Sequence, residues 1–525
     1  MTKVRSLLVL GAMLAAALLV AACGSDSSSS DSGGTIIRGT TDQPISYDPA
    51  GAYDLPSYDG IYSMYQNLLT VEPGGNKAVP EAADSCDFTD KDNKVFECTL
   101  KSGLKFSDGS DLTAEDVVFS FERNVEIADP NGASSLLANM KSIEAKGDDT
   151  VVFNLKEPDA TWPLLLTTAS FAIVPSDVYP ANKLQPSDQV VGSGRYTLAD
   201  YQPGQQTVME KNDSYQGADP AKNDRVIIQY FDKASALKLA VQNGDVDIAY
   251  RSLSPTDIDS LDGADGLSVI SGNGTEIRYL VFNTKLQPGD NDAQKLAIRQ
   301  AVAQTIDRQS IADNVYNGTV QPLYSMIPQG VEFANQGFSD KYGEAPDVNA
   351  AKQTLADAGV DTPVPLEVWW TPSHYGAASG DEYAEIKRQL DESGLFDVTL
   401  KSTEWNQYST AAFTDKYPTY QLGWFPDYPD ADDYTSPFYL PDSFLNIHYD
   451  NAEMNKLIGQ EKSSDDPQVR QQAFDRIGEI GAEDAPTIPI WQADQVAAVR
   501  DGVHGVEETF DPSFIFRFWL ISKDQ

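Results

Sequence analysis

Histidine and cysteine are scarce in this sequence, with three of each among 525 residues. The histidines, His374, His448 and His504, are far apart, and none has the HExxH spacing of a zinc protease. The sequence also has no GxSxG motif of α/β-hydrolases, no GxxxxGK(S/T) phosphate-binding loop and no GxGxxG motif that opens a helix. We therefore predict that the protein is not an enzyme and that it has no catalytic residues, no metal site and no cofactor.

Basic residues are also few: 38 Lys and Arg stand against 79 Asp and Glu, which gives a formal net charge of -41. Nucleic-acid phosphates repel such a chain, and no run of Lys or Arg offers a local exception. The same charge disfavours electrostatic attachment to anionic lipid. Acidity of this kind keeps an extracellular protein soluble, and by itself it does not indicate a cationic ligand.

Long uncharged stretches are limited to the N-terminus. Residues 7–22 are 16 apolar or small residues that follow Lys3 and Arg5, whereas a membrane-spanning helix needs about 20. These proportions are typical of a secretory signal peptide, which we predict for residues 1–22. The best later stretch, residues 162–175, has no charge but is too short to span a membrane, so we interpret it as buried structure.

The end of the signal peptide, VAAC at residues 20–23, resembles a bacterial lipobox. The resemblance implies that Cys23 receives a diacylglyceryl group and becomes the N-terminus of the mature protein. An ordinary secretory signal followed by an incidental cysteine is the alternative. Residues 24–34 (GSDSSSSDSGG) are suited to a flexible tether. We therefore predict a protein that is lipid-anchored to the outer face of the bacterial cytoplasmic membrane.

The two remaining cysteines, Cys86 and Cys98, form an even pair in an oxidising compartment. A polar turn, DKDNK at residues 90–94, lies between them and a strand-like segment follows it. The two cysteines could therefore lie across a hairpin at disulfide distance. We expect a structural disulfide, with two free thiols as the alternative.

Short β-type runs alternate with amphipathic helices in the rest of the chain. Residues 113–116 (TAED) are typical of a capped helix start, and apolar residues follow at helical spacing, namely Val117, Val118, Phe121 and Val125. A strand at 366–370, a helix at 381–392 and a strand at 398–400 indicate a β-α-β unit, which implies a parallel strand pair. About 490 residues follow the leader and tether, enough for two or three domains. The pattern predicts an α/β fold with more than one sheet.

Four acids are close together in the sequence: Asp427, Asp430, Asp432 and Asp433. Oxygen ligands suit calcium, but the glycine and terminal glutamate of an EF-hand loop are missing. Pro426 would also stiffen the segment. We therefore do not predict a metal site there.

Six segments resemble one family when they are read in order, and they extend over almost the whole mature chain. They are VFECTLKSGLKFSDGSDLTAEDVVFSFER at 95–123, GSGRYTLADY at 192–201, YLVFNT at 279–284, IRQAVAQTIDRQSI at 298–311, GWFPDY at 423–428 and APTIPI at 485–490. The family is that of the extracytoplasmic solute-binding proteins of peptide and nickel ABC importers, the dipeptide and oligopeptide-binding group. Arg195 and Thr305 depart from the family pattern, which often has Pro and Ala there.

The resemblance implies a two-lobed periplasmic-binding-protein-like fold, class II, of the large peptide-binding type with an extra region. Lobe I would combine residues 35–76, 190–271 and 490–525, an additional region at 77–189 would pack on it, and lobe II would be 272–489. The ligand would lie in the cleft, buried when the lobes close about a hinge. The resemblance further implies a monomer that docks on the permease subunits of an ABC transporter.

In peptide-binding members of this family the aspartate of the GWxxDY motif, here Asp427, pairs with the free α-ammonium of the peptide. Trp424 and Gly423 would flank that contact, and a charge-assisted hydrogen bond to a desolvated ammonium is a strong one. The remaining cleft candidates by position in the family are Trp405 and Tyr279, for which a buried packing role is the alternative, and Tyr47, whose segment resembles a first-lobe loop near the mouth of the cleft. No residue can be assigned to the carboxylate of the ligand.

The predicted function is therefore the capture of short peptides and their delivery to a membrane permease. The nearest alternative keeps the fold and changes the solute to an oligosaccharide, a nickel chelate or an opine. A hydrolase is the more distant alternative.

Overall fold

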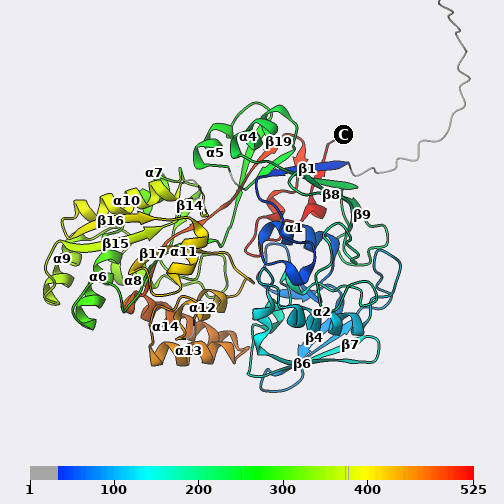
Figure 1. The fold of residues 1–525 in the computed structure, drawn as a ribbon, viewed down its shortest axis with the longest axis horizontal. Helices are drawn as coiled ribbons and strands as arrows, with labels where there is room; N and C mark the ends of the chain where they lie inside the picture. The colour runs from blue at the N-terminus through cyan, green and yellow to red at the C-terminus, as the bar shows by residue number, and fades with distance from the viewer. Residues whose placement is uncertain (1–33, 252, 373, 377, 442, 525) are drawn as a thin grey trace, which may run out of the picture. The chain divides into compact units, whose positions relative to one another are not determined.

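Two large mixed β-sheets organise the part of the chain that the structure describes (Figure 1). The computed structural model describes residues 34–524 apart from 252, 373, 377 and 442. The predicted signal peptide, Cys23 and nearly all of the tether lie outside these described residues. Within them, no helix is long and apolar enough to cross a membrane.

The first sheet has seven strands in the order β12-β19-β11-β1-β10-β9-β8. The central strand β1 pairs in parallel with β10 and β11, and the other pairs are antiparallel. Its strands come from three separate stretches of the chain: β1 (Thr35–Thr40), β8 (Tyr196–Gln202), β9 (Gln206–Lys211), β10 (Arg225–Tyr230), β11 (Ile248–Tyr250) and β12 (Leu267–Gly272), and β19 (Gln495–Arg500). We call the part of the molecule built on this sheet the first lobe.

The second sheet has six strands in the order β14-β18-β13-β17-β15-β16, and we call the part built on it the second lobe. Its strands are β13 (Ile277–Phe282), β14 (Val320–Pro322), β15 (Val364–Trp370), β16 (Phe396–Ser402), β17 (Thr419–Trp424) and β18 (Thr487–Ala493). Strands β15 and β16 are parallel and helix α10 (Ser379–Glu392) connects them. The β-α-β unit predicted from the sequence is therefore confirmed.

Both faces of the second sheet are covered, which explains the nearly continuous apolar sequence of β13. Ile277, Tyr279 and Val281 belong to one buried cluster, whereas Leu280 and Phe282 belong to another. This alternation follows from the two-residue period of a strand. It also places Arg278 and its neighbour Tyr279 on opposite faces of the sheet.

A third sheet of four strands, in the order β4-β5-β7-β6, packs its own core. Its strands are β4 (Ala83–Phe88), β5 (Val95–Leu100), β6 (Met140–Lys146) and β7 (Thr150–Leu155). Helix α2 (Ala114–Ile127) packs against it, and the Asp116 carboxylate accepts hydrogen bonds of 2.9 Å from the backbone N–H and hydroxyl of Thr113. The predicted helix start is confirmed, but Val125 lies on the exposed face of the helix.

The chain passes between the two large sheets twice within the described residues. Residues 273–276 join β12 to β13, and Asp494 joins β18 to β19. The Gln495 amide donates a 2.8 Å hydrogen bond to the carbonyl of Asn273, so the two crossings lie side by side. The predicted lobe boundary at residue 490 falls inside β18, and the strand itself ends at Ala493.

Further helices follow from local sequence features. The apolar pattern over residues 293–316 forms a pair of helices, α6 (Asp292–Thr305) and α7 (Arg308–Asn314), because Asp307 caps the second one. Helix α4 spans Ala234–Asn243. The uncharged stretch 162–175 contains helix α3 (Trp162–Leu165) and is buried structure, as predicted.

Candidate functional site

A cavity of about 1230 Å³ is lined by residues of both lobes and by the two crossings between them. From the first lobe come the segments after β1 and β11 and the start of helix α1 (Leu55–Met64). From the second lobe come β13, the end of β17 and the start of helix α11 (Trp405–Ala412). This volume exceeds that of most small-molecule sites and has room for a ligand of several residues.

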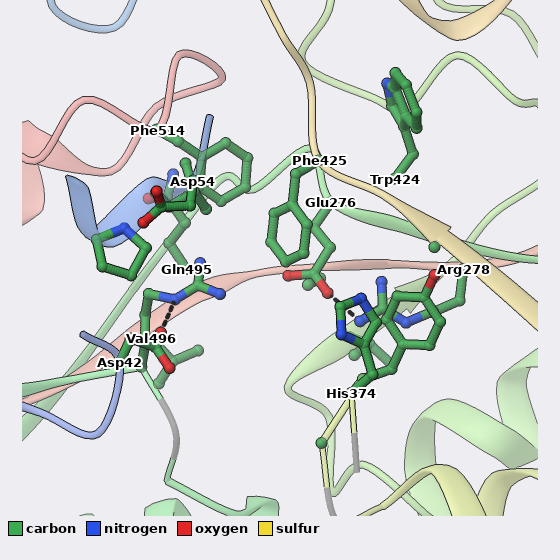
Figure 2. A pocket seen from close by; sticks show the side chains of 18 of the residues that line it. Asp42, Asp54, Glu276, Arg278, His374, Trp424, Phe425, Gln495, Val496 and Phe514 are labelled. Atoms are coloured by element: carbon green, nitrogen blue, oxygen red, sulfur yellow. Dashed lines mark hydrogen bonds and ion pairs between the residues drawn. The ribbon is translucent and has the colours of Figure 1, made fainter. Parts of the chain in front are cut away.

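Figure 2 shows the two sides of this cavity. Arg278, Glu276, His374 and Trp424 lie on the second-lobe side, and Asp54 and Phe514 lie across from them. Of the residues predicted from the sequence, four line the cavity: Gly423, Trp424, Asp427 and Trp405.

Asp427 follows β17 and contacts the opposite lobe directly. Its Oδ1 accepts a short hydrogen bond from the hydroxyl of Tyr53, and its carbonyl accepts one of 3.1 Å from Thr168 Oγ1. Its backbone N–H donates to Asp433 Oδ2 at 2.9 Å. Asp427 therefore joins the second lobe to two residues of the part of the chain before residue 190.

The electrostatics of this pair of acids favour a cation. Burial raises the pKa of Asp427 to about 7, and burial together with the charge of Asp427 raises the pKa of Asp433 well above its ordinary value. Among the described residues, neither acid forms an ion pair; Asp433 Oδ2 instead accepts a 3.1 Å hydrogen bond from Trp424 Nε1. A cation brought to this position would restore the ionised form of the acids.

The other two acids of the cluster serve the structure of the second lobe. Asp430 forms hydrogen-bonded ion pairs with Arg470 at 2.6 and 2.9 Å. Asp432 lies 3.6 Å from Lys462 and accepts a hydrogen bond from Ser436. Within the described part of the chain, no group of three or more His, Cys, Asp or Glu side chains has the arrangement of a metal site.

Gly423 leaves space for an arginine of the neighbouring strand. A Cβ atom at this position would lie 2.2 Å from Arg278 Nη1 and 2.9 Å from the ring of Tyr375. Both atoms belong to one stack, because the buried Arg278 guanidinium lies 4.1 Å from the centre of the half-buried Tyr375 ring and 4.9 Å from that of Trp491. The glycine is thus required for the packing of Arg278 against the cavity wall.

The substitution Gly423→Ala should lower the free energy of unfolding by about 1–3 kcal/mol, the usual cost of overpacking a core. Chemical denaturation of the variant and the wild type would measure the change. Gly459→Ala is a matched control, since a Cβ there meets nothing within 4 Å in helix α13 (Ala452–Lys462). That control should be neutral or slightly stabilising, and equal effects of the two substitutions would contradict the packing role of Gly423.

Aromatic side chains form much of the second-lobe wall. Trp424 stacks on Phe444 with ring centres 5.5 Å apart, and Phe444 contacts Phe413 at 5.3 Å. Trp405 stacks on His374 with ring centres 3.7 Å apart. Burial and the nearby Arg278 lower the pKa of His374 to about 4, so its ring is neutral at physiological pH.

Two predicted cleft residues lie elsewhere. Tyr279 is fully buried on the face of β13 that points away from Arg278, and its ring packs edge-on against Phe438 at 5.3 Å. Tyr47 is fully buried beneath the first sheet, where its hydroxyl is 2.6 Å from that of Thr207. Neither residue lines the cavity, because each side chain is held inside a lobe core.

Sequence reasoning missed several side chains that line the cavity: Tyr53, Arg251, Glu276, Arg278 and Phe444. A signal existed for Arg278, since it directly precedes the YLVFNT segment and must face opposite to Tyr279. No comparable signal marked Tyr53, which meets Asp427 across a separation of 374 residues.

These features define a class of protein. Two α/β lobes, joined by two adjacent crossings and enclosing a cavity lined from both sides, are the architecture of a two-lobed periplasmic binding protein. The structure of an ABC-transporter substrate-binding protein, CtaP from Listeria monocytogenes, matches with a TM-score of 0.81 at 24% identity, covering 94% of this chain and 100% of that one. The predicted fold class is confirmed.

The chain belongs to the bacterial extracellular solute-binding proteins, family 5, whose model for the middle region matches residues 77–446. This confirms the family resemblance inferred from the six segments. A dipeptide-binding protein of Pseudomonas aeruginosa is 25% identical over 493 residues, which cover 88% of this chain and 90% of that protein. A solved structure of DppA from Helicobacter pylori in complex with the peptide STSA matches with a TM-score of 0.77 at 21% identity, covering 94% and 98% of the two chains.

Proposed function

We propose that this protein captures short peptides in the cavity between its lobes and delivers them to the permease of an ABC importer. The observation that carries the proposal is Asp427, a half-buried acid that lines a large cavity beside the buried Asp433; neither acid has a cationic partner among the described residues. A relative named as a dipeptide-binding protein and a structural neighbour solved with a peptide support the choice of solute.

The α-ammonium of a peptide would bind the Asp427 carboxylate. A carboxylate has about four acceptor positions, so Asp427 can keep the hydrogen bond from Tyr53 and accept others from an ammonium. Because Tyr53 belongs to the first lobe and Asp427 to the second, a ligand held there would contact both lobes. Such contacts favour the closed arrangement over an open one.

The experiment that tests this function is thermal unfolding of the full chain with pools of di- to octapeptides, with cello-oligosaccharides, opines and nickel-histidine in parallel. A ligand present at 100 times its dissociation constant stabilises a protein by about 2.7 kcal/mol. A rise in Tm with peptides that disappears when the peptides are N-acetylated would support the proposal. A rise with sugars, opines or the nickel chelate and none with peptides would overturn it.

We further propose how the protein is organised and placed. The signal peptide would be removed, Cys23 would carry the lipid anchor on the outer face of the cytoplasmic membrane, and the binding protein would act as a monomer. Lobe I would comprise residues 35–76, 190–271 and the C-terminal part, and the crossing at Asp494 is a better start for that part than residue 490. Residues 77–189 would form the additional region, and lobe II would extend to β18.

A disulfide between Cys86 and Cys98 completes the proposal. The two residues are opposite each other on β4 and β5, with Cα atoms 4.1 Å apart. Protein purified from an oxidising compartment should therefore resist alkylation at both positions until it is reduced, as measured by mass spectrometry. Alkylation of both thiols in the folded, unreduced protein would contradict the disulfide.

A further inference from the structure

The charged groups that line the cavity are mostly acidic. Five carboxylates reach it, and two guanidinium groups are the cations among the described lining residues: Asp42, Asp54, Glu276, Asp427 and Asp494, with Arg251 and Arg278. His374 adds no charge because burial and Arg278 lower its pKa to about 4. When all the acids are ionised, the lining therefore has an excess of three negative charges.

Both arginines already have acidic partners. Arg251 Nε lies 2.9 Å from Asp42 Oδ2, and its guanidinium lies 5.1 Å from the centre of the Phe425 ring. Arg278 Nη2 pairs with Glu276, its Nη1 donates a 3.1 Å hydrogen bond to the Ile277 carbonyl, and its side chain is only 3% exposed. Arg278 Nε has no hydrogen-bond partner among the described residues, but this atom is buried. A ligand carboxylate at either arginine would thus share the cation with an acid that already pairs with it.

The other three acids form no ion pair with a described residue. Asp54 caps helix α1 by accepting a 2.9 Å hydrogen bond from the Ser57 backbone, and Asp494 accepts one of 2.7 Å from Gln321. Burial raises the pKa of both carboxyl groups, as it does that of Asp427. Neutral hydrogen bonds therefore satisfy these acids in part and leave their charge uncompensated.

Aromatic faces add a second feature that suits a cation. Trp424, Trp405 and Phe514 line the same cavity as the acids, whereas Phe425 already has the Arg251 guanidinium 5.1 Å from its ring centre. The negative face of an aromatic ring attracts a cation placed over it. Acids without cationic partners beside aromatic rings thus form a lining that favours more than one positive charge on a ligand.

We propose that the cavity takes net-cationic peptides, which have a basic side chain in addition to the α-ammonium, and that it leaves their C-terminal carboxylate without an ionic partner. The inference rests on the proposed function and specifies the substrate class of that same site. A C-terminal carboxylate would lie in the cavity away from both arginines or at its opening. Anionic peptides would be rejected, because each added negative charge meets the same uncompensated acids.

The test is titration calorimetry of the full chain with six tripeptides, Ala-Lys-Ala, Ala-Gln-Ala and Ala-Glu-Ala, each as the free acid and as the C-terminal amide. We expect the lysine peptide to bind at least about tenfold more tightly than the glutamate peptide, a difference of about 1.4 kcal/mol, and the glutamine peptide to lie between them. Amidation should leave the affinity unchanged or raise it. Equal affinities across the series, or a tenfold loss on amidation, would overturn the inference while leaving peptide binding intact. Absence of binding by all six peptides would overturn the proposed function and this inference with it.

Charge-removing variants provide an independent readout. Glu276→Gln removes one negative charge and releases Arg278, so it should reduce the preference for lysine over glutamate by about fivefold or more. Asp494→Asn, at the crossing between lobes, should also reduce the preference for the lysine peptide over the glutamate peptide. This variant replaces Glu276→Gln in the test if Glu276→Gln does not fold. Glu126→Gln is the matched control, since it makes the same charge change on an exposed part of α2 outside the cavity. Reductions no larger than that of the control would contradict the proposal.

Discussion

Replacing Asp427 with asparagine should weaken the binding of a free-amine peptide by about 10²-fold or more. The substitution keeps the shape of the side chain and the hydrogen bond from Tyr53 but removes the counter-charge of the α-ammonium. Loss of one partner of a desolvated charge pair typically costs about 2–5 kcal/mol, much of it from the charge that is left behind. Titration calorimetry with the same peptide on wild type and variant would measure the change.

The same substitution should make the empty protein more stable at pH 8, and this opposite effect separates a binding role from a structural one. The pKa of Asp427 is raised in the folded state from the ordinary 3.8. Its ionisation therefore costs stability progressively as the pH rises from about 4 to about 7, and asparagine avoids that cost. Asp430→Asn is the contrasting control, because it breaks the ion pair with Arg470 and should destabilise the protein by about 3 kcal/mol. A loss of both stability and binding in Asp427→Asn would contradict the account.

Peptide affinity should fall about 50-fold between pH 7.5 and pH 5. The ammonium binds the ionised form of Asp427, whose pKa in the empty cavity is about 7 because of burial. Each pH unit below that value lowers the fraction of ionised carboxylate about tenfold, whereas the protonated fraction of the peptide α-amino group rises only from about two-thirds at pH 7.5 to nearly one at pH 5. Binding must then displace a proton, and the affinity falls accordingly.

The control for this pH dependence is Asp427→Asn, whose weaker binding should depend on pH much less steeply over the same range, because only Asp433 is left to titrate there. The groups around the Asp427 carboxylate are the Tyr53 hydroxyl and Asp433, and the pKa of both is raised by burial. Tyr53 does not ionise in this range. Protonation of Asp433 also removes negative charge as the pH falls, so it lowers the peptide affinity further. A wild-type affinity that is constant from pH 7.5 to pH 5 would contradict the assignment of the ammonium to Asp427.

The sequence predicted the parts of the structure that local patterns specify. The capped start of α2 and the β15-α10-β16 unit depend on the spacing of apolar residues and on capping side chains, which are readable within a short window. The GWFPDY segment likewise predicted that Gly423, Trp424 and Asp427 lie together, because the three positions are within five residues of each other at the end of one strand.

The contacts between residues far apart in the sequence could not be predicted in this way. Tyr53 meets Asp427, and Arg251 pairs with Asp42 across 209 residues, because the chain returns to the first sheet after long excursions. Tyr279 was placed in the cleft by its position in a motif, whereas the alternation of β13 puts Arg278 there instead. Tyr47 fails for a related reason: its loop is near the cavity, but its side chain points into the core.

The most direct test of the central claim is a crystal structure of the protein with a free-amine peptide from the binding screen. The account predicts electron density for the peptide in the cavity, with its α-ammonium nitrogen about 2.7–2.9 Å from an oxygen of Asp427 and Tyr53 still in contact with that carboxylate. A peptide whose ammonium lies away from Asp427, or a ligand bound outside the cavity, would contradict it.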